Sequence, residues 1–176
     1  MADDTEHADN RRRKLPSRTP QPEGHKGSLR WIQRAVNANP CPLDAMILPA
    51  LDGAGVIHWQ SPLRYDDFAE YRDAAFLECI GQSHLAEQLA AFWPARGPQW
   101  DALATTDRGD VLLVEAKAHI AELCSPPSQA RAASREKIET ALRDTAKHLN
   151  ARWPDRWIDC FYQLTNRLAY LYFLRK

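Results

Sequence analysis

The chain has 176 residues, of which 44% are hydrophobic and 26% are charged, as is typical of one soluble globular domain. Its 23 basic and 23 acidic residues leave no net charge, which argues against a molecule that attracts nucleic acid over its whole surface. No stretch has the roughly 20 apolar residues that span a bilayer, and four widely spaced cysteines without a secretory signal favour reduced thiols and a cytoplasmic location.

The charges are nevertheless unevenly distributed along the chain. Residues 1–39 carry 8 basic and 5 acidic residues, residues 40–125 carry 5 and 13, and residues 126–176 carry 10 and 5. An acidic middle region beside a basic C-terminal region is typical of a cation site next to a polyanion-binding surface. Solvated helix faces produce the same pattern, so the distribution gives only weak support to such a site.

Residues 1–28 are polar, contain three prolines and show no apolar periodicity, which predicts a disordered N-terminal tail. The tail includes the basic run Arg11-Arg12-Arg13-Lys14, which would either contact nucleic acid or act as a solubilising arm. Apolar residues at helical spacing begin with Leu29, so we expect one folded domain over residues 29–176.

Helical patterns flank a central segment of the chain. Asp66 and Asp67 are expected to cap one helix, and Ser83 is expected to cap the next. The last helix is expected to face the core with Phe161, Leu164, Leu168, Leu171 and Tyr172. The expected elements are helices over 29–36, 43–50, 66–80 and 83–92, a strand over 56–59, a long helix containing 138–149, and a final helix from about residue 159.

The central segment predicts a β-hairpin. Gln99–Thr106 forms the first strand, Asp107-Arg108-Gly109 a tight turn, and Asp110–Ala118 the second strand. Val111–Val114 is apolar at four consecutive positions, which is typical of a strand that is buried on both faces. We therefore expect this strand to lie in the centre of the sheet.

Charged side chains end the second strand. Glu115 and Lys117 share the face that carries Val111 and Leu113, because side chains alternate along a strand. Asp101 lies six residues before the turn begins, and Glu115 lies six residues after it ends. Antiparallel pairing therefore places the two carboxylates opposite each other. Charges at the end of a buried strand are costly unless they pair, bind a cation or take part in chemistry.

Two carboxylates, water and substrate oxygens are the ligands that Mg²⁺ or Mn²⁺ prefers. Such an ion lowers the pKa of bound water, and a nearby lysine stabilises negative charge that develops on a phosphate. The pattern therefore predicts a metal-dependent phosphodiesterase site formed by Asp101, Glu115 and Lys117. The alternative is a buried ion-pair cluster of the same residues with no catalytic role.

The sequence here resembles the PD-(D/E)XK nuclease superfamily, through Pro98-Gln99-Trp100-Asp101 and Glu115-Ala116-Lys117. The segments around both motifs are also similar to an uncharacterised bacterial branch. The proline departs from the pattern because it is not adjacent to the aspartate. The resemblance implies an α/β, restriction-endonuclease-like core in which a central β-hairpin of a small mixed sheet is flanked by helices. It also implies that Asp101, Glu115 and the Ala116 carbonyl bind the metal, and that Lys117 is the catalytic lysine.

Members of the superfamily often add a glutamate from a preceding helix, for which Glu78 is the first choice and Glu87 the second. Some add a polar group from a later helix, where Gln163, Arg167 and Tyr170 share one face. That face would grip a phosphate backbone or simply be exposed. The chain shows no candidate for the last core strand, so either residues 56–59 take an unusual place or the chain is a shortened version of a longer protein.

The resemblance implies a Mg²⁺- or Mn²⁺-dependent nuclease that acts on DNA in preference to RNA. The alternative is a catalytically inactive nuclease-like fold that binds nucleic acid or another protein. Divalent-cation binding distinguishes the two, because only a metal site gains thermal stability from the ion.

Overall fold

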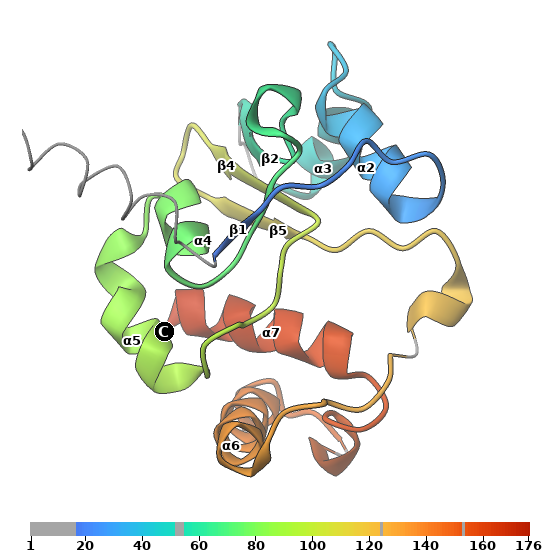
Figure 1. Ribbon diagram of the computed structural model, residues 1–176. Coiled ribbons are helices and arrows are strands. Elements are labelled where there is room, and N and C mark those ends of the chain that lie inside the picture. Colours follow the sequence, from blue (N-terminus) through green and yellow to red (C-terminus); the bar gives the residue numbers. More distant parts are fainter. Residues whose placement is uncertain (1–16, 52–54, 124, 153) are drawn as a thin grey trace, which may run out of the picture.

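The computed structural model describes residues 17–51, 55–123, 125–152 and 154–176 (Figure 1). The described chain is a mixed α/β fold with two small antiparallel sheets. The larger sheet has the order β2-β4-β5, and the smaller sheet pairs β1 with β3. The strands are β1 (Arg18–Thr19), β2 (Ile57–Ser61), β3 (Glu70–Tyr71), β4 (Ala102–Thr106) and β5 (Val111–Val114).

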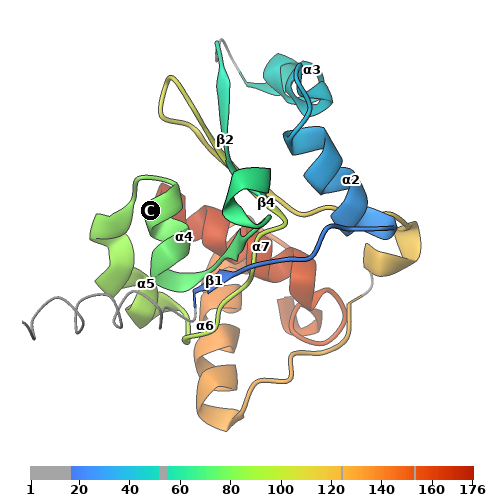
Figure 2. The same ribbon diagram turned by 45° about the horizontal axis from the view of Figure 1, so that its top comes forward.

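Helices pack on both sides of the larger sheet (Figures 1 and 2). No helix in the described ranges is long and apolar enough to cross a membrane. The α-helices are α2 (Gly27–Val36), α3 (Pro42–Ile47), α4 (Asp73–Cys79), α5 (Ala86–Phe92), α6 (Ala132–His148) and α7 (Tyr162–Arg175). Short 3-10 turns are η1 (Leu48–Ala50), η2 (Arg64–Asp66), η3 (Ser83–Leu85), η4 (Ile120–Leu123) and η5 (Pro154–Arg156).

The β4–β5 hairpin has the predicted turn. The Thr106 N–H donates to the Asp110 carbonyl at 3.0 Å, which leaves residues 107–109 in the loop. Gly109 has a φ of 84°, a left-handed conformation that glycine adopts without steric cost in such three-residue loops. The strands are shorter than predicted, because pairing ends where Ala102 lies opposite Val114.

Two expectations about the sheet are wrong for the described residues. All strand pairs are antiparallel rather than mixed, and β4, not β5, is the middle strand of the larger sheet. The apolar run of β5 is therefore not explained by a place in the middle of the sheet. Val111 and Leu113 pack against the main core, whereas Val114 packs against α2, so an edge strand has apolar contacts on both faces.

Two apolar layers enclose the hairpin. On one face Ile32 and Val36 of α2 pack with Ala102. On the other face lies the main core, in which Trp100 contacts Phe76 and Tyr170 at ring-centroid distances of 5.3 and 5.5 Å. This aromatic cluster joins α4 and α7 to the start of β4, and it forms the apolar floor next to the charged end of the hairpin.

The expected helix over 66–80 is wrong in its first half. Asp66 ends η2, and the chain then extends through β3 before α4 begins at Asp73. Asp66 does not cap a helix, because its carboxylate accepts hydrogen bonds from the Arg18 guanidinium, with Nη2 at 2.7 Å. A contact between residues 48 positions apart therefore overrides the local helical pattern.

The predicted tail is also wrong over residues 17–28. Arg18–Thr19 pairs with β3, the Gln21 side chain donates to Glu70 at 3.0 Å, and the Gln33 side chain joins Gly24 and Pro22. Polar hydrogen bonds rather than apolar burial order this segment, so no apolar periodicity marks it. Residues 1–16, including the basic run at 11–14, lie outside the described residues.

Candidate active site

The charged end of the hairpin brings Asp101 and Glu115 together as predicted. Pairing of Ala102 with Val114 is the last regular step of the ladder, and the same register places Asp101 opposite Glu115. Beyond this pair, a side chain replaces the backbone hydrogen bonds of the ladder, because Oδ2 of Asp101 accepts a hydrogen bond from the Ala116 N–H at 2.7 Å. The predicted register is therefore confirmed, and Asp101 holds the backbone of the segment that carries Glu115 and Lys117.

Glu115 lies between two cations. Its Oε1 pairs with the Lys117 ammonium. Its Oε2 accepts a hydrogen bond from Nε of Arg167 at 2.8 Å and another from Nη2 of the same residue. The side chains of Glu115, Lys117 and Arg167 are 18%, 21% and 15% exposed. Little solvent screens these charges, so the cluster is electrostatically strong.

Arg167 is held in place from several directions. Its Nη2 also donates to the Gln99 carbonyl at 2.7 Å, and its guanidinium lies 4.9 Å from the centroid of the Trp100 ring. A cation over an indole face is stabilised by the ring quadrupole. Arg167 therefore joins α7, the segment before β4 and the end of β5 in one cluster.

The other two residues of the predicted α7 face do not join this cluster. Gln163 is exposed, and its backbone N–H donates to the Ser125 hydroxyl at 2.9 Å. Tyr170 is fully buried against Trp93 and Trp100. The prediction of the α7 faces is therefore wrong for Tyr170 and correct for the exposed Gln163. Tyr170 and Phe173 face the core, while three residues expected to be buried are exposed, namely Phe161, Leu164 and Leu171.

Glu70 is a residue that the sequence reasoning missed. It lies on β3, and the pKa of its carboxyl is raised to about 7 by burial and by the charges of Asp101 and Glu115. The two predicted accessory residues, Glu78 and Glu87, are exposed on α4 and α5. The helical spacing of Phe68, Tyr71 and Ala75 hides the two-residue strand that brings Glu70 to the site.

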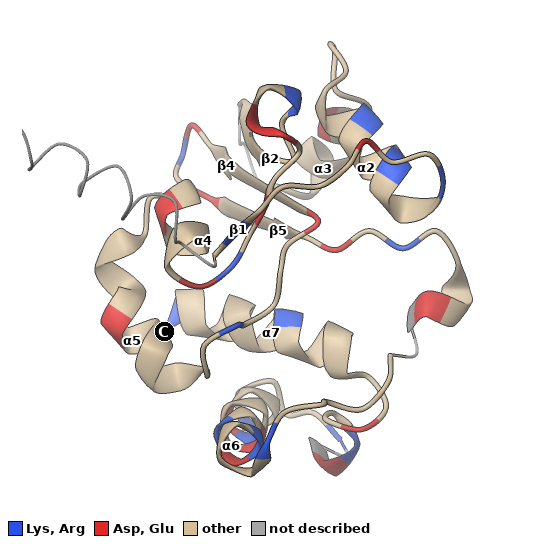
Figure 3. Cartoon of the chain, viewed as in Figure 1, with Lys and Arg blue, Asp and Glu red and all other residues tan. Residues whose placement is uncertain are grey.

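The cluster has an excess of negative charge when its carboxyls are ionised. Burial raises the pKa of Asp101, and the charge of Glu115 raises it further, against the opposing effects of the Ala116 N–H and of Lys117 and Arg167. Three carboxyls face two cations at this point. Figure 3 shows acidic positions where β4 begins and β5 ends, and a basic position on α7. An added cation would therefore be stabilised here.

The donor set fits a hard divalent ion. Asp101 and Glu115 supply carboxylate oxygens, and Ala116, which directly follows Glu115 in the chain, supplies a backbone carbonyl oxygen. Among the described residues, no group of three or more His, Cys, Asp or Glu side chains is positioned to hold a metal ion. The remaining ligands of Mg²⁺ or Mn²⁺ would accordingly be water and substrate oxygens, which these ions retain readily.

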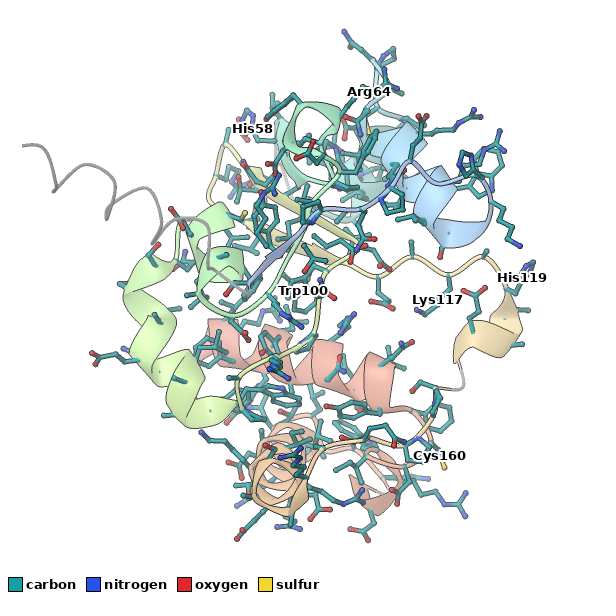
Figure 4. All side chains as sticks on the ribbon, viewed as in Figure 1. His58, Arg64, Trp100, Lys117, His119 and Cys160 are labelled. Atoms are coloured by element: carbon teal, nitrogen blue, oxygen red, sulfur yellow. The ribbon has the colours of Figure 1, made fainter. Side chains whose placement is uncertain are left out.

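Figure 4 shows Lys117 on the segment that follows β5, and His119 farther along the same segment. No protein-family model, curated protein or solved structure matches the chain.

Proposed function

We propose that this protein is a metal-dependent nuclease that hydrolyses phosphodiester bonds of nucleic acid, with DNA as the preferred substrate. The observation that carries the proposal is the convergence of Asp101, Glu115 and Lys117 at the open end of an otherwise apolar hairpin face. Their order along the chain is also the order of the PD-(D/E)XK motif that the sequence resembles.

Each residue of the cluster has a defined part in this proposal. Asp101 and Glu115 would hold Mg²⁺ or Mn²⁺, with the Ala116 carbonyl as a further ligand. A bound divalent ion would lower the pKa of the water that it binds and would stabilise negative charge on phosphate oxygens. The Lys117 ammonium orients the attacking water and donates to the phosphate oxygen on which negative charge develops.

Arg167 acts as a positioning residue in this proposal. Its Nε and Nη2 both donate to Oε2 of Glu115, which fixes the plane of that carboxylate. The same guanidinium is anchored on the Trp100 ring and the Gln99 carbonyl. The orientation of Glu115 is therefore set by α7 and does not depend on the ion.

The second candidate function is a nuclease-like fold without catalysis, which binds nucleic acid or another protein. Both oxygens of Glu115 already have cationic partners in Lys117 and Arg167, and this observation favours a closed ion-pair cluster. Under that alternative no divalent ion is needed for the charges to be satisfied.

Metal binding separates the two functions. Asp101→Asn removes one ligand charge while it keeps the shape of the side chain. We expect Mn²⁺ to raise the melting temperature of the wild type, because an ion that binds only the folded state stabilises it. Asp101→Asn should lose most of that rise, and cleavage of single-stranded, duplex and branched DNA should be lost with it.

The matched control is Glu78→Gln, which changes an exposed carboxylate on α4. It should keep both the Mn²⁺-dependent rise and the cleavage rate of the wild type. A wild-type protein that neither gains stability from Mn²⁺ or Mg²⁺ nor cleaves any of these substrates would contradict the proposed nuclease and leave the binding fold as the function.

A further inference from the structure

An exposed surface on α2 and η2 combines aromatic rings with basic side chains. Trp31 on α2 is 63% exposed and Tyr65 on η2 is 87% exposed. The Asn37 side chain joins the two elements, because it donates to the Pro62 carbonyl at 2.7 Å and accepts the Arg64 N–H at 2.8 Å. We call this surface the α2 surface, formed by Lys26, Arg30, Trp31, Arg34, Arg64 and Tyr65.

The α2 surface is strongly positive. Lys26, Arg34 and Arg64 are exposed and have no acidic partner among the residues that the structure describes. The nearby Asp66 and Asp67 are instead bound by Arg18. Basic positions are visible along α2 and on η2 in Figure 3. This group of exposed cations would attract a partner with negative charge.

The aromatic rings restrict the kind of partner. The Arg30 guanidinium lies over one face of the Trp31 ring, 5.8 Å from its centroid, so the ring is held beside a positive charge. Helical spacing places Arg34 one turn farther along the same side of α2. Alternating rings and cations are the features that bind unpaired bases and the phosphates between them. The bases of a duplex are already stacked on one another and offer no free face to an aromatic ring.

The α2 surface lies on the outer side of the helix that covers one face of the hairpin, and the candidate active site lies on the other face, toward α7. The buried side of α2 packs against Ala102, and Val114 and Ala116 join the same layer. Ala116 lies between Glu115 and Lys117 in the chain. The segment that follows β5 runs between α2 and α7 in both views (Figures 1 and 2). Because β5 is an edge strand of the described sheet, a nucleic acid strand that joins the α2 surface to the carboxylates would have to pass around β5.

We propose that the α2 surface binds a single-stranded stretch of the nucleic acid substrate, with Trp31 stacking on an unpaired base. This inference rests on the proposed nuclease function and specifies its substrate as one that has an unpaired segment. The surface would hold that segment while the attached strand enters the site at Asp101 and Glu115.

The test measures binding without cleavage. Fluorescence anisotropy in EDTA would follow a labelled oligo-dT of about 16 nucleotides and a duplex of the same length. Trp31→Ala should weaken oligo-dT binding about tenfold or more, as expected for loss of one base stack, and should change duplex binding less than twofold. Trp31→Phe should keep most of the affinity, because it retains an aromatic face.

Leu171→Ala is the matched control, since it also shortens an exposed apolar side chain but lies on α7. It should bind oligo-dT as tightly as the wild type. Melting curves of Trp31→Ala should match the wild type, since the ring is mostly solvent-exposed.

The outcomes distinguish this inference from the function on which it rests. Unchanged oligo-dT binding by Trp31→Ala, or no oligo-dT binding by the wild type, would overturn the α2 surface as a nucleic acid site even if the protein cleaves DNA. The second result would indicate a protein partner instead. Trp31-dependent binding by a wild type that does not cleave with Mn²⁺ would instead contradict the nuclease and leave the binding surface in place.

Discussion

The two faces of the β4–β5 hairpin are built from alternate residues of the same strands, yet they end differently. The face toward α2 stays apolar to its end, through Ala102, Val114 and Ala116. The face toward α7 is apolar only through Leu103 and Leu113. Packing alone therefore explains the first face completely and explains only half of the second.

The two faces differ because the face toward α7 ends in charged side chains. Asp101, Glu115 and Lys117 occupy positions that would continue an apolar strip, and Arg167 reaches them from α7. Well-packed apolar residues at such positions often give equal or greater stability than a buried ion pair. Apolar packing therefore does not account for charges at these positions, and the proposed nuclease chemistry would account for them.

The largest expected effect is on cleavage. Lys117→Ala removes the ammonium that would stabilise negative charge on the phosphate, so we expect the cleavage rate to fall about 10²–10³-fold. Mn²⁺ should still raise the melting temperature, because Asp101 and Glu115 remain. The measurements are single-turnover cleavage rates and melting curves with and without Mn²⁺.

Ala102→Leu on the opposite face provides the contrast. Ala102 is fully buried, and overpacking there should cost about 1–3 kcal/mol of unfolding free energy while cleavage by the folded protein persists. If Lys117→Ala cleaves DNA at the wild-type rate, the catalytic difference between the two faces does not exist.

The second effect is on stability. Arg167→Ala leaves Glu115 with Lys117 as its remaining cation and removes the guanidinium from the Trp100 ring. Breaking a buried ion pair costs about 3–5 kcal/mol, and because Lys117 remains we expect about 3 kcal/mol. Urea denaturation would measure this loss.

Arg135→Ala is a suitable control, since it breaks two more exposed pairs, with Glu139 and Asp159, and should cost much less stability than Arg167→Ala. Equal losses for the two arginine variants would mean that the charged face is no more tightly coupled than the surface.

Local pattern and long-range contact explain which parts were predictable. The hairpin turn and the register of Asp101 against Glu115 depend on residues within about twenty positions of one another, and the alternation of side chains was sufficient to predict both. The site residues of the motif followed from that register. Their chemical roles stay predictions.

The predictions that failed depend on contacts between residues that are far apart in the sequence. The face of α7 was predicted wrongly for Tyr170 because both sides of the helix carry large apolar residues, and only contacts with Trp93 and Trp100 select Tyr170 for the core. Glu70 was missed for a related reason. Its strand has two residues and is defined by pairing with β1, about fifty positions earlier, which no periodic pattern records.

The smallest expected effect is the pH dependence of Glu70, which tests whether the charged face carries excess negative charge. The Glu70 pKa is about 7 in the folded protein, against an ordinary value of 4.5. Between these values the folded state keeps a proton that the unfolded chain has released. The free energy of unfolding should therefore fall as pH rises from about 4.5 to about 7.

Glu70→Gln removes this titration, so the variant should gain stability relative to the wild type as pH rises from 5 to 8. We expect a relative gain of about 1 kcal/mol, since solvent partly screens the group. Mn²⁺ should reduce the difference at pH 8, because a cation near Asp101 and Glu115 stabilises ionised Glu70. Parallel stability curves for wild type and Glu70→Gln would mean that Glu70 does not sense those two charges, and the charged face would then consist of Asp101, Glu115 and their two cations alone.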